Sequence, residues 1–203
     1  MNHFRIGLDF DDVLIRAAYY TTKLHNELYG TNLTHENWYD PDMAPWGLTT
    51  ATEHTQRVID ILSSEAFRSV TPVQGAQEAL RQLKAMGHEL LVITGRPPAL
   101  KEATEWLIKT YFGDVLKLEN LYLTDHFNHE GKRVEKGDIA VGLGLTHFVD
   151  DVVSHANNVA SKGITTILYS DDYKWNQNGA DEEVVKLSSW DAIVRFIEDE
   201  AAA

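Results

Sequence analysis

Short, continuous runs of apolar residues alternate along this chain with longer segments in which apolar positions recur every three or four residues. The continuous runs predict buried strands at residues 4–8, 89–94, 118–123, 147–150 and 164–169. The helical spacing predicts helices at residues 14–29, 50–62, 72–86, 98–113, 138–143, 154–162 and 190–198. Strands that alternate with helices are typical of an α/β fold with a doubly wound, mostly parallel, Rossmann-like sheet.

Several helix boundaries are marked by residues that start or end helices. Gly30 is placed to end the first helix in a left-handed conformation, and Thr50-Ala-Thr-Glu53 is a capping box. Thr71 precedes a proline at the expected first helical position, and Gly87 ends that helix. We therefore expect a small helical cap, residues 15–69, inserted after the first strand of a core formed by residues 1–14 and 70–203.

Three carboxylates, those of Asp9, Asp11 and Asp12, follow the first predicted strand directly. Two like charges ~4 Å apart repel by ~4 kcal/mol at an effective dielectric constant of 20, so these groups need a nearby positive charge to stay ionised. Magnesium is the first choice, because hard divalent cations prefer oxygen ligands. Alternatively, Asp11 or Asp12 N-caps the following helix and Asp9 is solvated.

Polar residues also end later strands. Asp9, Thr94 and Asp150 all lie at the carboxyl ends of predicted strands, which is where open α/β sheets bind ligands. One aspartate could attack phosphorus and form an aspartyl-phosphate, while a second carboxylate moves protons. Thr94, the amide of Gly95 and the charge of Lys136 would hold a phosphoryl group.

Asp150, with Asp151 behind it, would complete the oxygen ligands of the magnesium ion. Each part of this site has an ordinary alternative. Residues 94–97 could form a simple turn, Lys136 could be solvated, and the acid pair at 150–151 could N-cap the next helix. The occurrence of all the parts together, at the ends of successive strands, favours a site.

The composition narrows the possible functions. The formal net charge of −13 disfavours binding to a nucleic acid polymer, because that affinity comes largely from lysine and arginine contacts to phosphate. The absence of cysteine excludes disulfides, thiolate zinc sites and cysteine nucleophiles. No apolar run approaches the ~18 residues of a membrane span, and the N-terminus lacks the pattern of a signal peptide. We therefore expect a cytoplasmic protein that does not bind membranes.

Taken together, four segments resemble the motifs of the haloacid dehalogenase-like hydrolase superfamily: Asp9-Phe-Asp11-Asp12-Val13, Ile93-Thr94-Gly95-Arg96, Lys136, and Phe148-Val-Asp150-Asp151. The resemblance implies that Asp9 is the nucleophile of a phosphatase and that Asp11 is its general acid/base. It implies phosphoryl contacts from Thr94 and Lys136. It also implies a magnesium ion held by Asp9, the Asp11 backbone carbonyl and Asp150.

Asp12 departs from this family pattern, since many members carry glycine there, and we expect it to add charge near the phosphate. The segment 15–69 looks like the cap that the family inserts at this point. The double acid 150–151 and the aromatic cap also resemble the deoxyribonucleotidase-like branch of the family.

The substrate is expected to be a small phosphorylated metabolite. We expect Asp12, Gly95 and Arg96 to contact it from the core, and Trp38, Tyr39 and Trp46 to contact it from the cap, where they could stack on a base. A nucleoside 5'-monophosphate is the first choice. A sugar phosphate, or a non-catalytic role in binding a phosphorylated ligand, remains an alternative, and packing of the aromatics inside the cap is another. The sequence is compatible with a monomer or a homodimer.

Two other protein classes fit less well. A phospho-receiver domain would need its acceptor aspartate after the third strand and no large insertion after the first. A nicotinamide-dependent oxidoreductase would need a glycine-rich turn after the first strand, where carboxylates would instead repel a pyrophosphate.

Overall fold

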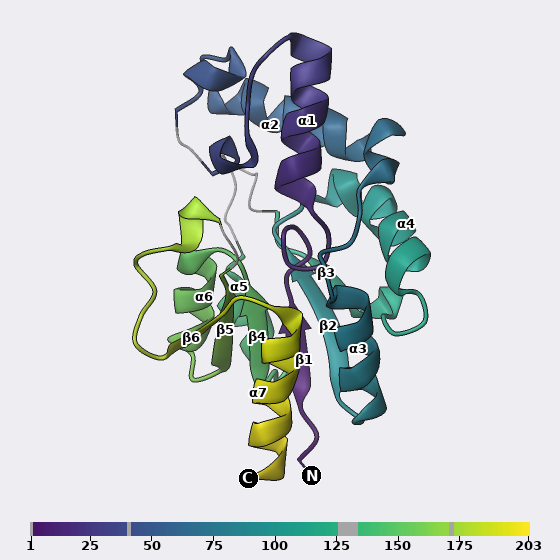
Figure 1. Cartoon of the computed structure of the whole chain (residues 1–203), viewed down its shortest axis with the longest axis vertical. Helices are drawn as coiled ribbons and strands as arrows, with labels where there is room; N and C mark the ends of the chain where they lie inside the picture. The colour runs from purple at the N-terminus through teal and green to yellow at the C-terminus, as the bar shows by residue number, and fades with distance from the viewer. Residues whose placement is uncertain (1, 40–41, 126–133, 171–172) are drawn as a thin grey trace.

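The computed structural model describes residues 2–39, 42–125, 134–170 and 173–203. Figure 1 shows a central sheet with helices on both faces and two further helices, α1 and α2, above the carboxyl ends of its strands. The strands are β1 (Arg5–Leu8), β2 (Glu89–Thr94), β3 (Leu121–Leu123), β4 (His147–Asp150), β5 (Thr165–Tyr169) and β6 (Val184–Leu187). The α-helices are α1 (Ala17–Tyr29), α2 (Ala51–Ser63), α3 (Ala76–Ala85), α4 (Lys101–Phe112), α5 (Lys136–Gly142), α6 (Val153–Ala160) and α7 (Trp190–Ala202).

The six strands form one parallel sheet in the order β3-β2-β1-β4-β5-β6, which confirms the predicted fold class. The strand order reverses between β1 and β4, where Leu8 lies opposite Val92 on one side and Val149 on the other. A reversal of this kind opens a crevice at the carboxyl ends of the two strands. In sheets of this kind a ligand would be expected next to the residues that follow β1 and β4.

Alternate residues of β2 serve two different cores. Leu90 and Val92 belong to the apolar cluster that includes α3, α4 and α7, whereas Leu91 and Ile93 belong to the cluster that includes α5 and α6. Successive side chains of a strand point to opposite faces, so a strand buried on both faces must be apolar throughout. This double burial explains the continuous apolar runs in the sequence.

The segment between β1 and β2 leaves the sheet and returns to it along one path. The amide of Arg16 donates to the carbonyl of Thr71 at 3.0 Å, and the amide of Val73 donates to the carbonyl of Leu14 at 2.9 Å. Residues 15–69, called the inserted segment below, therefore join the sheet through two adjacent extended connections. Figure 1 shows α1 and α2 of this segment above the strand ends.

These connections correct the predicted start of α3. The Thr71 and Pro72 pattern predicted a helix from residue 72, but Pro72 instead forms an antiparallel bridge with Ile15. The helix begins at Ala76, after Gly75 takes a left-handed conformation with φ 83°. Pairing with the outgoing chain holds residues 71–73 extended, and this pairing overrides the local helix signal.

Two further differences concern edge strands. The edge strand β6 was not predicted, because only Val184 of its four residues is buried and the surrounding sequence is polar. At the other edge, β3 is shorter than predicted, since Leu118–Asn120 form a 3₁₀ turn before it. Edge strands bury less surface than central ones, so their apolar patterns are weaker.

Candidate active site

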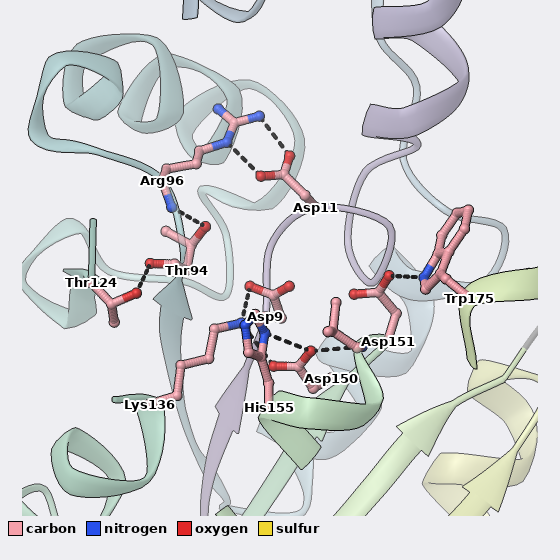
Figure 2. A network of polar contacts seen from close by, with 11 residues as sticks. Asp9, Asp11, Thr94, Arg96, Thr124, Lys136, Asp150, Asp151, His155 and Trp175 are labelled. Atoms are coloured by element: carbon pink, nitrogen blue, oxygen red, sulfur yellow. Dashed lines mark hydrogen bonds and ion pairs between the residues drawn. The ribbon is translucent and has the colours of Figure 1, made fainter. Parts of the chain in front are cut away.

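The site begins at Asp9, the residue directly after β1. The amide of Asp9 donates to the carbonyl of Val149 at 2.9 Å, which ties this position to β4 at the point where the strand order reverses. Thr94 and Asp150 end β2 and β4, as predicted. Figure 2 shows that their side chains lie around a common centre with the side chain of Lys136.

Lys136 is the first residue of α5, and its side chain is buried rather than solvated. Its Nζ atom lies 2.8 Å from Oδ1 of Asp9 and 2.7 Å from Oδ2 of Asp150. The amide of the next residue, Gly137, donates to the side chain of Asn158 on α6, which anchors this end of α5. One buried ammonium group thus bridges two buried carboxylates.

The titration of these groups follows from burial and mutual charge. Burial raises the pKa of Asp9 to about 6, although the charge of Lys136 opposes this shift. Burial also works against the charged form of Lys136, but Asp150 and Asp9 raise its pKa above the usual value. Burial acts to raise the pKa of Asp150, yet the charge of Lys136 holds this pKa well below the usual range.

Asp151 adds a third buried carboxylate. Burial, followed by the charges of Asp150 and Asp9, raises its pKa well above the usual value. Its Oδ2 atom accepts a hydrogen bond from the indole N–H of Trp175 at 2.8 Å, whereas Oδ1 is buried and has no hydrogen-bond partner among the described residues. Oxygen atoms from Asp9, Asp150 and Asp151 all lie within 4.8 Å of one another. Three carboxylates with one lysine leave excess negative charge, which suits a hard divalent cation.

The Asp11 carboxylate takes no part in this cluster. It is directed at Arg96, whose Nε atom lies 2.8 Å from Oδ2 and whose Nη2 atom lies 2.7 Å from Oδ1. The role implied for Asp11 in metal binding rests on its backbone carbonyl and stays a prediction. Arg96 itself lies directly after Gly95 in the turn that follows β2, and its amide donates to the Thr94 hydroxyl at 3.3 Å.

Asp12 was expected to contact substrate, and its position corrects that expectation. Both of its carboxylate oxygens accept the amide of Ala18, at 3.1 and 3.0 Å, in the first turn of α1. Burial and the charge of Asp11 raise the pKa of Asp12 well above its usual value, against the effect of that hydrogen bond. Asp12 thus satisfies an amide of the first turn of α1, as the capping alternative expected of one of these acids, although Arg16 is the N-cap residue and Asp9 is buried rather than solvated.

A cavity of about 360 Å³ lies between the sheet and the inserted segment. Asp9, Asp11, Gly95, Arg96 and Lys136 line it from the core. Its other wall includes Trp38, Tyr39, Met43, Ala51, His54, Thr55 and Val58 from the inserted segment. A molecule bound here would contact both the carboxylates and the aromatic side chains.

Trp46 does not line this cavity, which corrects its predicted place among the substrate-binding residues. Its side chain is fully buried, with ring centres 4.9 Å from His25 and 4.4 Å from His54. It packs between α1 and α2. For Trp46, packing inside the inserted segment was the right alternative.

Beside the carboxylates lie His155 and Trp175, whose side chains were not identified from the sequence. His155 on α6 lines the cavity, and its Nδ1 atom lies 3.5 Å from Oδ1 of Asp150. Trp175, which bonds to Asp151, also packs against Tyr39 of the inserted segment with ring centres 5.2 Å apart. The position of His155, four to five residues after the acid pair at 150–151, is a weak sequence signal that it belongs to the site. No local signal marks Trp175, because 24 residues separate it from Asp151.

Comparison with known proteins places these features in one family. The family model described as "5' nucleotidase, deoxy (Pyrimidine), cytosolic type C protein" matches residues 2–197. A Bacillus cereus protein with the name "Putative nucleotidase" is 25% identical over 201 residues, and the match covers 97% of this chain and 99% of that protein. A similarly named protein of Oceanobacillus iheyensis is 25% identical over 177 residues, covering 85% of this chain and 90% of its own.

Solved structures give the same fold. A haloacid dehalogenase family hydrolase from Deinococcus radiodurans, solved with bound phosphate and sodium, has a TM-score of 0.65 at 17% identity. The match covers 98% of this chain and 96% of that one.

Within the described residues, none of the helices combines the length and the apolar character of a membrane span. The chain therefore belongs to the cytosolic type C 5'-nucleotidase family of the haloacid dehalogenase superfamily and is a phosphoric monoester hydrolase.

Proposed function

We propose that this protein is a magnesium-dependent phosphatase that hydrolyses a nucleoside 5'-monophosphate through an aspartyl-phosphate on Asp9. The observation that carries the proposal is the cavity between the sheet and the inserted segment. The same 360 Å³ space is lined by Asp9, Asp11 and Lys136 on one side and by Trp38 and Tyr39 on the other. The cavity thus joins groups that suit phosphoryl transfer to side chains that can hold a flat apolar group.

In the proposed first step, a carboxylate oxygen of Asp9 attacks phosphorus and the bond from phosphorus to the leaving oxygen breaks. Asp11 enters this step protonated and gives its proton to that oxygen, so a neutral alcohol departs and Asp11 is left as the carboxylate that pairs with Arg96. In the second step a water molecule attacks the phosphorus, Asp11 takes its proton, and the bond between Asp9 and phosphorus breaks. Inorganic phosphate leaves and both aspartates return to their starting states.

Lys136, Thr94 and the amide of Gly95 would hold the phosphoryl oxygens during both steps. Phosphoryl transfer depends mostly on positioning and on neutralising charge, and Lys136 already lies 2.8 Å from the Asp9 carboxylate. Asp9, Asp150 and Asp151 would hold the magnesium ion, together with the Asp11 backbone carbonyl. When bound, magnesium supplies positive charge that offsets the negative charge of the carboxylates and the phosphate.

The inserted segment would act as a cap that contacts the leaving group and excludes water from the aspartyl-phosphate. Trp38 and Tyr39 are its aromatic residues at the cavity, and stacking of a base on an aromatic ring contributes ~1–3 kcal/mol by alanine substitution. This argument favours a nucleoside over a sugar as the leaving group. We further propose that the protein acts in the cytoplasm on this small metabolite.

A panel of phosphorylated metabolites, assayed for phosphate release with and without magnesium, tests the proposal. Nucleoside 5'-monophosphates should give the highest kcat/KM, and removal of magnesium should abolish turnover. A preference for sugar phosphates would reject the nucleotide assignment while keeping the phosphatase. Binding of phosphorylated ligands without any phosphate release would show a non-catalytic protein.

A further inference from the structure

Arg96, which has no role in the proposed chemistry, forms a two-point ion pair with Asp11, which has one. Two parallel contacts of 2.8 and 2.7 Å join the guanidinium group to both oxygens of the carboxylate. The Arg96 side chain is completely buried, whereas 14% of the Asp11 side chain is exposed. Both residues line the cavity, but only the Asp11 side chain is accessible, because the Arg96 side chain is completely buried.

The surroundings of Arg96 hold its guanidinium group in one place. Its Nη1 atom donates to the Thr104 hydroxyl on α4 at 3.0 Å. Its Cζ atom lies 4.9 Å from the ring centre of Phe10 and 5.8 Å from that of Phe67. All three guanidinium nitrogens therefore have partners within the protein.

This arrangement argues against the expectation that Arg96 binds substrate through its charge. An arginine that clamps a phosphate needs its planar fork free, and here the fork is already occupied by a carboxylate of matching geometry. The same fork restricts rotation of the Asp11 carboxylate. Asp11 keeps one orientation because a completely buried arginine holds both of its oxygens.

We infer that Arg96 is a positioning residue for Asp11, holding the carboxylate at the angle from which it exchanges protons with the leaving group and with water. This inference rests on the proposed function, since it presupposes that Asp11 is the general acid/base. Without the fork, the Asp11 side chain would rotate among its rotamers. A displacement of about 1 Å at a catalytic group can lower a rate by roughly 10²-fold.

The first test uses leaving groups that differ in their need for a proton. For Arg96→Met, kcat/KM with a nucleoside monophosphate or a simple alkyl phosphate should fall by roughly 10²-fold. With a dinitrophenyl phosphate, whose leaving oxygen needs no proton, kcat/KM should change by less than about threefold. The activated ester should also give a burst of dinitrophenolate, because the variant hydrolyses the aspartyl-phosphate slowly.

A double-mutant cycle then shows whether Arg96 acts through Asp11. If it does, the double variant Asp11→Asn with Arg96→Met should retain the activity of Asp11→Asn alone to within about threefold. If Arg96 binds the substrate phosphate instead, the two losses should multiply. In that case KM should rise equally for activated and unactivated esters, and the inference would be wrong.

Two further variants distinguish loss of the positioning contact from a general effect of replacing a buried or paired arginine. Arg96→Lys keeps the charge but reaches only one carboxylate oxygen, so its loss on the alkyl phosphate should lie between those of the wild type and Arg96→Met. Arg81→Met is the matched control, because it breaks an arginine–aspartate contact of 2.6 Å to Asp114 outside the candidate site, and it should retain wild-type activity. Inhibition by inorganic phosphate should be the same in all the arginine variants.

The outcomes separate this inference from the proposed function. A wild-type protein that hydrolyses no ester would reject both. A wild-type phosphatase whose Arg96→Met and Arg96→Lys variants lose activity equally on every ester would reject only the inference. Selective loss on unactivated esters, together with the non-additive cycle, would establish the positioning role.

Discussion

Asp11 and Asp12 are neighbours whose carboxylates act in different places. Asp12 has a left-handed backbone with φ 58°, a conformation that aspartate tolerates better than most residues do. This turn directs its side chain to the first turn of α1, while Asp11 faces the cavity and Arg96. The family's common glycine at the Asp12 position would adopt the same backbone without strain. The Asp12 carboxylate therefore binds the first turn of α1 and does not line the cavity.

Asp9 is the nucleophile in the proposed mechanism, so replacing this one residue is the most direct test of that mechanism. Asp9→Asn should abolish turnover, because an amide cannot act as the nucleophile that forms the aspartyl-phosphate. The fold should remain, since the amide has nearly the same shape and Lys136 keeps its contact with Asp150. Single-turnover phosphate release and the melting temperature measure the two effects. Unchanged single-turnover kinetics would remove Asp9 from this role.

The helices α1 and α2 pack around a small aromatic core. Trp46 lies between His25 of α1 and His54 of α2, and the ring of Tyr29 lies 4.5 Å from that of His25. Trp38 belongs to the same group, with its ring centre 6.4 Å from that of Trp46, yet Trp38 also reaches the cavity. One cluster thus provides both the core of the inserted segment and part of its substrate-facing wall.

This difference in position predicts different effects for two similar substitutions. Trp38→Ala should lower kcat/KM for nucleotides by roughly tenfold or more, because it removes a stacking surface worth ~1–3 kcal/mol. Turnover of a small aryl phosphate should change little. Equal losses on both substrates, with a lower melting temperature, would instead make Trp38 part of the packing alone and would weaken the nucleotide assignment.

Trp46→Ala should act mainly on stability. Removing a fully buried tryptophan leaves a cavity and typically costs about 3–5 kcal/mol of unfolding free energy. Urea denaturation measures this loss. Trp38→Ala is the comparison, because Trp38 lines the cavity on one side and should therefore lose less stability, although it is itself nearly buried at 8% exposure. A stable Trp46→Ala variant with a selective loss on nucleotides would contradict the packing role.

We expect His25 to make the packing of α1 against α2 sensitive to pH. Burial, followed by the charges of Arg57 and His54, lowers the pKa of His25 to about 4, from an ordinary value of 6.5. Below pH 6.5 the unfolded chain therefore binds a proton that the folded chain does not. The stability provided by neutral His25 should be fully present above pH 6.5 and lost as the pH falls towards 4, by about 1–3 kcal/mol.

Urea unfolding at several pH values, for the wild type and His25→Gln, measures this dependence. Other groups titrate in the same range, so the informative quantity is the difference between the two proteins. The variant should show the shallower fall in unfolding free energy between pH 7 and pH 4. Parallel curves would mean that His25 does not contribute.

At the scale of the whole molecule, the reversal of strand order brings together charges from distant parts of the chain. Asp9 follows β1, Asp150 ends β4, and Lys136 begins α5, so every contact of this cluster depends on the assembled sheet. An unfolded chain would not hold these groups together. A cation bound by the cluster should therefore favour the folded state.

Magnesium should raise the melting temperature, and chelation should abolish turnover. At a free concentration one hundred times the dissociation constant, binding to the folded state alone contributes about 2.7 kcal/mol. For a protein of this size, each kcal/mol shifts the melting temperature by roughly 2–4 °C. Differential scanning fluorimetry with and without magnesium measures the shift, and Asp151→Asn should reduce it. Full activity after exhaustive chelation would reject the magnesium requirement.

The sequence by itself determined five of the six strands, most helices and the placement of Asp9 and Asp150 at strand ends. These predictions succeeded because they depend on local signals. Buried strands need continuous apolar runs, and the acids at 9 and 150 stand where such runs end. Parallel strands bring their carboxyl ends to one edge, so residues far apart in the chain could be assigned to one site.

Tertiary structure decided what each side chain contacts. Pairing with residues 14–16 kept 71–73 extended, despite a local signal for helix. Burial between two helices made Trp46 a packing residue, and the left-handed turn at Asp12 directed its carboxylate to α1. Arg96 faces Asp11 across 85 positions of sequence, and Trp175 reaches Asp151 from the loop after β5. Such contacts join residues that only the folded chain brings together, so no local pattern could predict them.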